Sequence, residues 1–324
     1  MRNLVITIIL LASVCVYAQT DDKTTLKELN QKLVESYKNN KLDDALKYAN
    51  QAVELSLKIY GIENAETAVA YSNLGTIQRD KKKYKESVLS FQKTNEIYLK
   101  ISNLKSNGLI ESYENLAFSQ FLDKKYDESI SAYLKAMELS EVKSGKENKE
   151  LFSPTLDLAN AFSKNKNFEK ADEYYLKSTK LALKHFGRGS LEFLKIDFLR
   201  SSNCERNKEL DTAYNKARKE LIPEQVDSNT AEIINAGVIN GKAVYLAKPA
   251  YPAEAKANRL QGSFKVKVII DEKGNIIYAK SDCGQGILGE ASENAAYQSK
   301  FSPTILNGKP VKILGIVVYN FVAK

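Results

Sequence analysis

Few side chains in this sequence have the type and spacing that catalysis or metal binding requires. The single histidine, His185, stands just before Gly187 at the end of an expected helix, where the helix dipole favours a cationic side chain. Without a second histidine there is no pair of imidazoles for a metal ion, and the many serine and acidic residues show no spacing typical of a catalytic set. The sequence therefore predicts no enzyme activity, no metal site and no cofactor.

The glycine-rich stretch and the cysteines do not change this conclusion. The stretch CGQGILG, residues 283–289, lacks the Lys-Ser/Thr pair of a phosphate-binding loop, so we interpret it as an ordinary loop. Cys204 and Cys283 lie in different expected domains, and Cys15 lies in the N-terminal apolar segment. An oxidising compartment would permit a disulfide between the first two, but two separate buried thiols fit their positions better.

The first residues have the layout of a secretory signal peptide, which we place at residues 1–18. One early cation, Arg2, precedes an apolar stretch at residues 4–16 and a small residue at Ala18. This stretch is shorter than the roughly 20 residues that a membrane-spanning helix needs. We therefore expect cleavage after Ala18 and export, with a periplasmic location; an uncleaved inner-membrane anchor is the alternative.

The middle of the chain contains an internal repeat. Four segments align on Leu42, Tyr84, Tyr126 and Phe168, each 42 residues after the one before. Two sets of small residues keep the same step: Ala45, Ser87, Ser129 and Ala171, and Ala52, Thr94, Ala136 and Ser178. An aromatic residue or leucine, followed by a small residue three positions later and by an aromatic residue or alanine four positions beyond that, marks one face of a helix. A second helix precedes each copy. The pattern predicts a series of helical hairpins.

These hairpins resemble the tetratricopeptide repeat family in its longer, kinesin-light-chain style. The Leu74-Gly75 pair, matched by Leu116-Ala117 and Leu158-Ala159, carries the resemblance together with the small-residue registers. It implies an all-α solenoid, which we place at residues 24–222, with four clear repeats and one degenerate repeat. Such solenoids imply interaction scaffolds that bind protein partners. The lysine runs between paired helices are interpreted as solvated turns.

The pattern changes after the stretch YPAEAKANRLQG, residues 251–262. A short helix, expected to end at Gly262, is followed by an alternating strand, the turn DEKGN and a second strand. A helix within residues 288–300, a loop at residues 301–311 and a last apolar strand complete the chain. The order predicts a small α+β domain with a three-stranded antiparallel sheet.

This part resembles the C-terminal domain of the TonB energy-transducer family. We place it at residues 240–324, after a linker at residues 223–239. The positions that carry the family pattern are Tyr251, Pro252, Gly262, Gly274, Phe301, Pro303, Gly308 and Pro310.

The resemblance implies that an extended peptide, for example from an outer-membrane transporter, binds by β-strand addition. We expect the last strand, residues 311–322, to form the outer edge of the sheet and to receive this peptide. The partner-binding residues implied are Leu314, Ile316, Val317, Val318, Tyr319 and Asn320. Both faces of this strand are apolar, so one face should pack on the helix while the other needs cover from the repeats, a second copy or a ligand.

The charge distribution is compatible with this role. The formal net charge is +8, and residues 237–324 carry 12 Lys and Arg against 6 Asp and Glu. These cations are nearly all lysine, which argues against nucleic acid as a partner. The sequence thus predicts an exported interaction protein of the TonB-related type that acts in transmembrane transport. The alternatives are a membrane-anchored energy transducer and an envelope assembly scaffold that forms a homodimer through the C-terminal domain.

Overall fold

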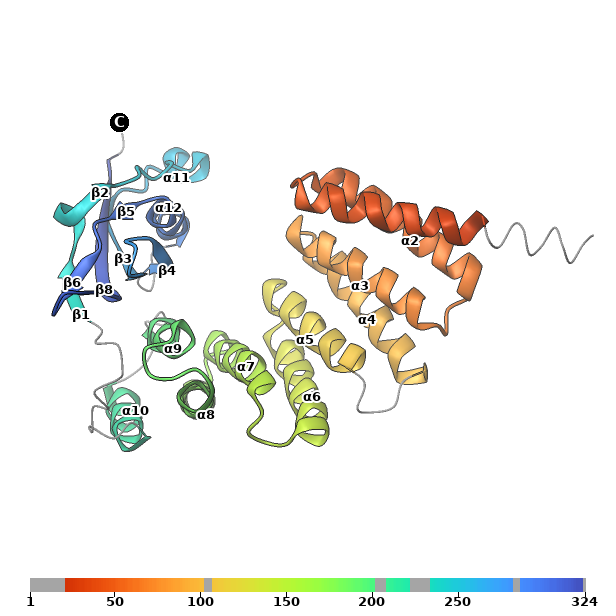
Figure 1. The fold of residues 1–324 in the computed structure, drawn as a ribbon, viewed down its shortest axis with the longest axis horizontal. Coiled ribbons are helices and arrows are strands. Elements are labelled where there is room, and N and C mark those ends of the chain that lie inside the picture. Colours follow the sequence, from red (N-terminus) through yellow and green to blue (C-terminus); the bar gives the residue numbers. More distant parts are fainter. Residues whose placement is uncertain (1–20, 102–106, 202–207, 222–233, 282–285, 323–324) are drawn as a thin grey trace, which may run out of the picture. The chain divides into compact units, whose positions relative to one another are not determined.

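The structure is a computed structural model that describes residues 21–101, 107–201, 208–221, 234–281 and 286–322 (Figure 1). It divides into two compact units, residues 1–157 and 158–324, and each is treated separately below. The expected signal peptide and the cysteines Cys15, Cys204 and Cys283 lie outside the described residues.

The first unit consists of antiparallel helical hairpins, as the repeat predicts. Residues 21–38 form its first described helix. A short 3-10 turn, η1 (Lys149–Leu151), precedes α7, which begins in this unit and ends in the second. The α-helices are α2 (Leu42–Tyr60), α3 (Ala65–Asp80), α4 (Tyr84–Ile101), α5 (Asn107–Leu122), α6 (Tyr126–Ser144) and α7 (Phe152–Lys164).

The two registers of small residues are buried, which confirms the face predicted for these helices. The residues of both sets have at most 1% of their surface exposed. Gly75 shows why small residues are needed, because a Cβ placed there would lie 2.9 Å from the ring of Phe91 on the next helix. The hydroxyl of Ser87 also donates a hydrogen bond to the Gly75 carbonyl at 2.8 Å, and Ser129 repeats this bond to Ala117 at 2.7 Å.

The turns inside the hairpins repeat with the same period. Asn40, Lys82, Lys124 and Lys166 all have a positive φ, between 56° and 63°. The next amide donates to a carbonyl five residues earlier, as from Lys125 to the Gln120 oxygen at 2.8 Å. This bond satisfies a carbonyl at the end of the helix, as in the Schellman motif. The lysine runs thus form helix-capping turns.

The second unit begins with the rest of the repeats. Its helices are α8 (Phe168–His185), α9 (Leu191–Ser201) and α10 (Lys208–Leu221), and His185 ends α8 as predicted. The guanidinium of Arg200 makes a two-pronged ion pair with Asp172 at 2.8 and 3.0 Å, with both side chains about nine-tenths buried. It also lies 3.8 Å from the centre of the Tyr214 ring. This cluster joins α8, α9 and α10, which include the degenerate last hairpin.

The C-terminal domain is an α+β fold, as predicted, but its main sheet has four strands in the order β1-β8-β3-β4. The three antiparallel strands β8, β3 and β4 were expected; β1 was not, and it pairs with β8 in parallel. Two small sheets, β2 with β5 and β6 with β7, complete the domain. The main strands are β1 (Ile234–Val238), β3 (Gly262–Ile270), β4 (Ile276–Ser281) and β8 (Ile313–Phe321). The minor elements are η2 (Asn240–Lys242), β2 (Ala243–Tyr245), α11 (Ala253–Ala257), β5 (Lys300–Phe301), β6 (Thr304–Leu306) and β7 (Lys309–Val311).

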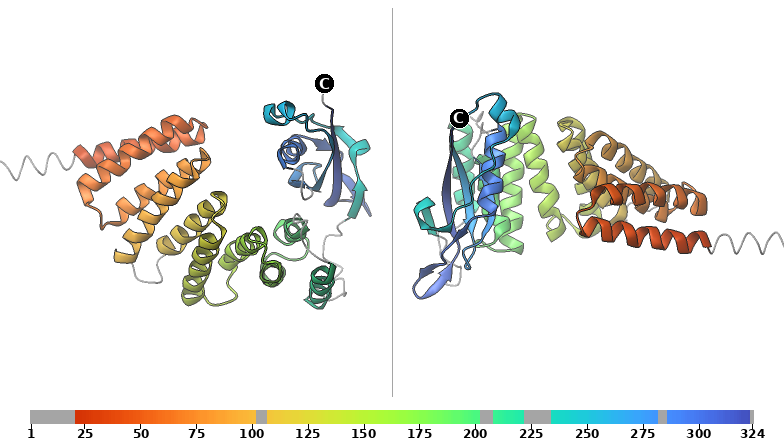
Figure 2. Two further views of the ribbon diagram at one scale, coloured as in Figure 1. Left: turned by 180° about the vertical axis from the view of Figure 1, so that it is seen from behind. Right: turned by 90° about the horizontal axis from the view of Figure 1, so that it is seen from above.

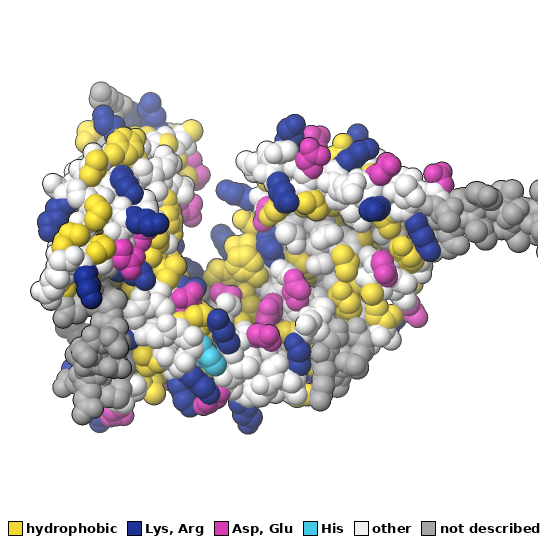
Figure 3. Space-filling view, in the orientation of Figure 1, with side chains coloured by type: hydrophobic (Ala, Val, Ile, Leu, Met, Phe, Trp, Pro, Cys, Tyr) yellow, Lys and Arg dark blue, Asp and Glu magenta, His cyan; other side chains and the backbone are white. Residues whose placement is uncertain are grey.

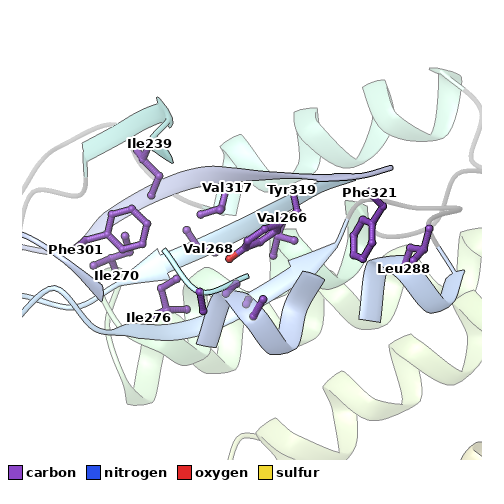
Figure 4. Packing of buried hydrophobic residues seen from close by; sticks show 14 of the residues in the cluster. Ile239, Val266, Val268, Ile270, Ile276, Leu288, Phe301, Val317, Tyr319 and Phe321 are labelled. Atoms are coloured by element: carbon purple, nitrogen blue, oxygen red, sulfur yellow. The ribbon is translucent and has the colours of Figure 1, made fainter. Parts of the chain in front are cut away.

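The sheet packs on helices through both faces. On one face lies α12 (Gly286–Tyr297), as the ribbon views show (Figure 2). It contributes Leu288 to a core with Val268 and Val317 (Figure 4). The neighbouring register pair Ile269 and Tyr278 points to the opposite face, because side chains alternate along a strand. There the ring of Phe198 from α9 lies 5.8 Å from the Tyr278 ring. The repeats therefore supply part of the cover that the sequence requires for this second face.

Candidate strand-binding site

The expected binding strand, β8, lies in the interior of the sheet. It pairs with β3 along its whole length, from Ile313 opposite Ile270 to Phe321 opposite Gly262. On its other side it pairs with β1, so the prediction that it forms the outer edge is wrong. The residues responsible, 234–238, were assigned to the linker at 223–239. The sequence of β1 is INAGV, and its asparagine and glycine disfavour strands, so it gave no strand signal.

The six residues expected to bind a partner divide into two groups. Val317 and Tyr319 are buried in the core against α12. The backbone groups of these two residues point toward β3, with which β8 pairs. The other four alternate with them on the second face, where they are half-buried or exposed: Leu314, Ile316, Val318 and Asn320. This alternation confirms the two faces predicted for β8. Only the residues of the second group point their backbone N–H and C=O groups away from β3.

The β8 backbone on the β1 side is satisfied by the residues around the end of β1. The Ile239 amide donates to the Ile316 carbonyl at 3.0 Å. The Asn240 side chain then pairs with Val318 twice, because its amide nitrogen donates to the Val318 carbonyl at 2.7 Å and its oxygen accepts from the Val318 amide at 2.8 Å. A side-chain amide thus takes the place of one residue of a paired strand.

A notch in β8 receives Ile239. Gly315 has no side chain, and a Cβ placed there would lie 2.7 Å from the Ile239 Cδ1 atom. Ile239 is fully buried, and in Figure 4 its side chain projects from its segment toward the sheet. The glycine is needed here for the close approach of another side chain, since its own φ is not in the left-handed region.

The opposite edge of the sheet, β4, is closed by side chains from α12. The Tyr297 hydroxyl accepts a hydrogen bond from the Ala279 amide at 3.1 Å, and the Glu293 carboxylate accepts one from the Ser281 amide at 2.8 Å. Capping of this kind prevents a further strand from pairing at β4. These two amides of β4 are therefore occupied by side chains, whereas the other side of the sheet carries the short strand β1.

The turn between β3 and β4 depends on Gly274. Its φ is 81°, and a Cβ there would come within 1.9 Å of the Phe301 carbonyl oxygen. The Phe301 amide donates to the Gly274 oxygen at 2.9 Å. The Asp271 carboxylate accepts the Lys273 and Asn275 amides at 2.9 and 2.7 Å, which fixes the turn. The family positions Gly274 and Phe301 therefore act together.

The stretch that opens the domain differs in detail from the prediction. Pro252 is the N-cap residue of α11, and the Tyr251 hydroxyl donates to the Leu260 carbonyl and so closes the turn after the helix. Gly262 does not end the helix; α11 is shorter, and Arg259 takes the left-handed conformation with φ 50°. Gly262 instead begins β3.

The stretch expected as a loop at residues 301–311 contains a hairpin. Strands β6 and β7 pair through a two-residue turn, Asn307 and Gly308, with φ 51° and 78°. The dipeptide Asn-Gly favours this turn, and it was the signal that could have predicted the hairpin. Pro303 is exposed just before the hairpin, and Pro310 is exposed within β7.

The first unit has a groove on its surface that is lined by apolar and charged side chains. This groove of about 1000 Å³ lies between the helix of residues 21–38 and the start of α3. Val34 and Val69 are about half exposed in it, beside Lys23, Lys27 and Glu66.

On the face shown in Figure 3, cationic side chains of the C-terminal domain are interspersed with apolar ones.

Within the described ranges, no three His, Cys, Asp or Glu side chains are grouped as metal ligands would be. In the same ranges, no helix combines the length and the apolar character that crossing a bilayer requires.

Comparison with known proteins finds a family match in each part of the chain. Residues 29–100 and 108–184 match the family profile "Tetratricopeptide repeat", and residues 247–322 match "Gram-negative bacterial TonB protein C-terminal". No curated protein matches the chain.

Solved structures show the likeness of the repeats. The kinesin-light-chain TPR-like repeats of Podosopora anserina superpose with a TM-score of 0.51 at 14% identity, covering 61% of this chain and 91% of that one. A single-substitution variant of that protein gives a TM-score of 0.51 at 13% identity, covering 60% and 95%. At these identities the likeness shows the fold.

Proposed function

Because this chain joins tetratricopeptide repeats to a TonB C-terminal domain, we propose that it is a periplasmic interaction protein that serves transmembrane transport. An extended segment of a partner, such as an outer-membrane transporter, binds at the β1 side of β8, and other partners bind the repeats. Residues 1–18 are removed on export. The chain is not an enzyme, since both domain types are interaction modules.

One observation carries the proposal: the outward backbone of β8 is already paired by a segment of the chain itself. Strand β1 runs parallel to β8, and after it the Ile239 amide bonds the Ile316 carbonyl and the Asn240 side chain bonds both backbone groups of Val318. Backbone pairing along a strand supplies affinity without demanding a long side-chain match. On the opposite edge, Tyr297 and Glu293 occupy the amides that a new strand would need.

Site-specific photocrosslinking in the native envelope tests the proposal. A photoreactive residue at Asn320, which is exposed on β8, should capture a partner through a short extended segment that mass spectrometry can identify. The same residue at Pro303, which is exposed beside the β6–β7 hairpin, is the control. Equal capture at both positions, or capture at Pro303 alone, would place the partner elsewhere on the domain.

The location is tested on the same preparation. The intact mass of the chain from the periplasmic fraction should correspond to a start at Gln19. A chain that keeps residues 1–18 and fractionates with the inner membrane would contradict export and would favour an anchored protein.

A further inference from the structure

We infer that residues 234–240, which are strand β1 and the two residues that lead from it into η2, occupy the place of the partner segment, so that their sequence describes the partner and their removal opens the site. The inference rests on the proposed function of the β8 edge. It specifies a segment that runs parallel to β8, places an aliphatic side chain over Gly315, and follows it directly with asparagine. This internal segment and the partner compete for one edge.

The notch at Gly315 requires an aliphatic side chain in the partner segment. Every second residue of β8 from Ile313 to Phe321 faces the core, and Gly315 is the one position in that series without a side chain. The space is filled by Ile239, whose Cγ1 and Cγ2 atoms would lie 3.1 and 3.2 Å from an added Cβ. A small residue in place of Ile239 would leave this notch empty, and a charged residue would be buried without a partner.

The Asn240 amide sets the second requirement. It satisfies both the donor and the acceptor of Val318 at once. Among side chains of this length, only an amide offers a donor and an acceptor together, whereas an aspartate would face the Val318 carbonyl with a second acceptor. Asparagine directly after the aliphatic residue is therefore the pattern that this edge selects.

The rest of the internal segment is short and irregular, which permits exchange. Strand β1 has five residues, and its register on β8 shifts between Asn235 and Val238. Gly237 within this shift has a φ of 62°, and Val238 is 62% exposed. Before the shift, Ile234 packs against the core and its amide donates to the Lys312 carbonyl. After the shift, Ile239 and Asn240 are the two anchor residues. A partner that reproduces these two anchors would replace the internal segment.

A peptide titration on the full-length exported chain tests the inference. The probe is a fluorescent synthetic peptide with the sequence of residues 234–241, INAGVING. The double variant Ile239→Ala/Asn240→Ala releases the internal segment and should bind the probe at least about tenfold more tightly than the wild type, since hydrogen-bond and packing anchors no longer compete. Probes in which the isoleucine is replaced by serine, or the asparagine by aspartate, should lose this gain.

Hydrogen exchange reports where the probe binds. The Val318 amide should be protected in the wild type, exposed in the double variant, and protected again when the probe is added. The variant Gly315→Ala fills the notch and should refuse the probe even when the Val318 amide is exposed. If the double variant unfolds by circular dichroism, Asn240→Ala alone serves, with a gain of about threefold expected from one hydrogen-bonding side chain.

The outcomes separate this inference from the proposed function. An exposed Val318 amide in a folded variant that fails to bind the probe overturns the inference, even if envelope partners still crosslink at Asn320. Equal binding of the native and substituted probes would contradict the requirement for isoleucine and asparagine, and this result also overturns the inference. Specific probe binding without any envelope crosslink supports the inference about the edge and contradicts the proposed function alone.

Discussion

The repeats and the C-terminal sheet achieve burial over very different distances along the chain. In the repeats, the buried hydroxyl of Ser87 bonds a carbonyl 12 residues earlier, and Ser129 does the same. In the sheet domain, Asn240 bonds Val318 across 78 residues. A repeat can therefore lose a contact and remain supported by its neighbours, whereas the sheet domain depends on contacts that close only when all of it is folded.

The largest difference should appear when a methyl group is added to a glycine. Gly274→Ala places a Cβ against the Phe301 carbonyl at a positive φ, so we expect a loss of at least about 4 kcal/mol and unfolding of the sheet domain. Gly61 in the repeats is the matched control: its φ is 77°, and no atom lies within 4 Å of an added Cβ. Gly61→Ala should cost about 1 kcal/mol. Calorimetry that shows similar losses would mean that the contact with Phe301 is easily relaxed.

Breaking the ion pair that joins the last hairpins should have the next largest effect. Arg200→Ala removes the buried guanidinium that makes the two-pronged ion pair with Asp172, at a cost of about 3–5 kcal/mol in unfolding free energy. The control is Lys58→Ala, which removes an exposed pair with Asp22 and should cost less than about 1 kcal/mol. Urea unfolding measures both. A loss below 1 kcal/mol for Arg200→Ala would show that the other surroundings of Asp172 compensate for the missing guanidinium.

A smaller, pH-dependent effect is expected at Glu114 on α5. Burial, followed by the nearby carboxylates of Asp157, Glu111 and Glu150, raises the pKa of Glu114 from 4.5 to about 7. The folded state thus binds this proton more tightly than the unfolded state, so stability falls as the pH rises from about 4.5 to about 7.

Glu114→Gln removes that penalty. We expect the variant to be more stable than the wild type by about 1–2 kcal/mol at pH 8, with the difference shrinking toward pH 4.5. Thermal melts across this range measure it, and Glu128→Gln, an exposed position on α6, is the control. A gain that stays constant with pH would assign the effect to helix propensity instead.

The smallest effect, and a stabilising one, is expected in the repeat turns. Lys124 has a φ of 63°, which suits glycine, so Lys124→Gly should stabilise the chain by about 0.5–1 kcal/mol. The control is Lys125→Gly at the next position, where φ is −87° and glycine brings only its entropy cost. Stabilisation by both substitutions would indicate that relief of lysine repulsion, and not the backbone conformation, is the cause.

The sequence predicted the repeats better than the sheet because contacts in the repeats join residues close in the chain, whereas contacts in the sheet join distant ones. Ala45, Ser87, Ser129 and Ala171 could be recognised because each copy confirms the others. Strand β1 has no second copy, and its pairing with β8 depends on residues far along the chain. The two side-chain faces of β8 could be predicted from local alternation. The pairing of its second edge with β1 could not be predicted in this way. The notch at Gly315 and the amide of Asn240 become visible only once β1 is in place.

The position of the internal strand also has a consequence for the newly made chain. Residues 234–240 are synthesised before β8, so they are already present when β8 pairs with β3 and leaves an edge that could join other chains into aggregates. A tethered strand acts at an effective concentration in the millimolar range, well above that of any neighbouring molecule. Each chain therefore carries its own protection against aggregation at that edge, in place before the edge itself forms.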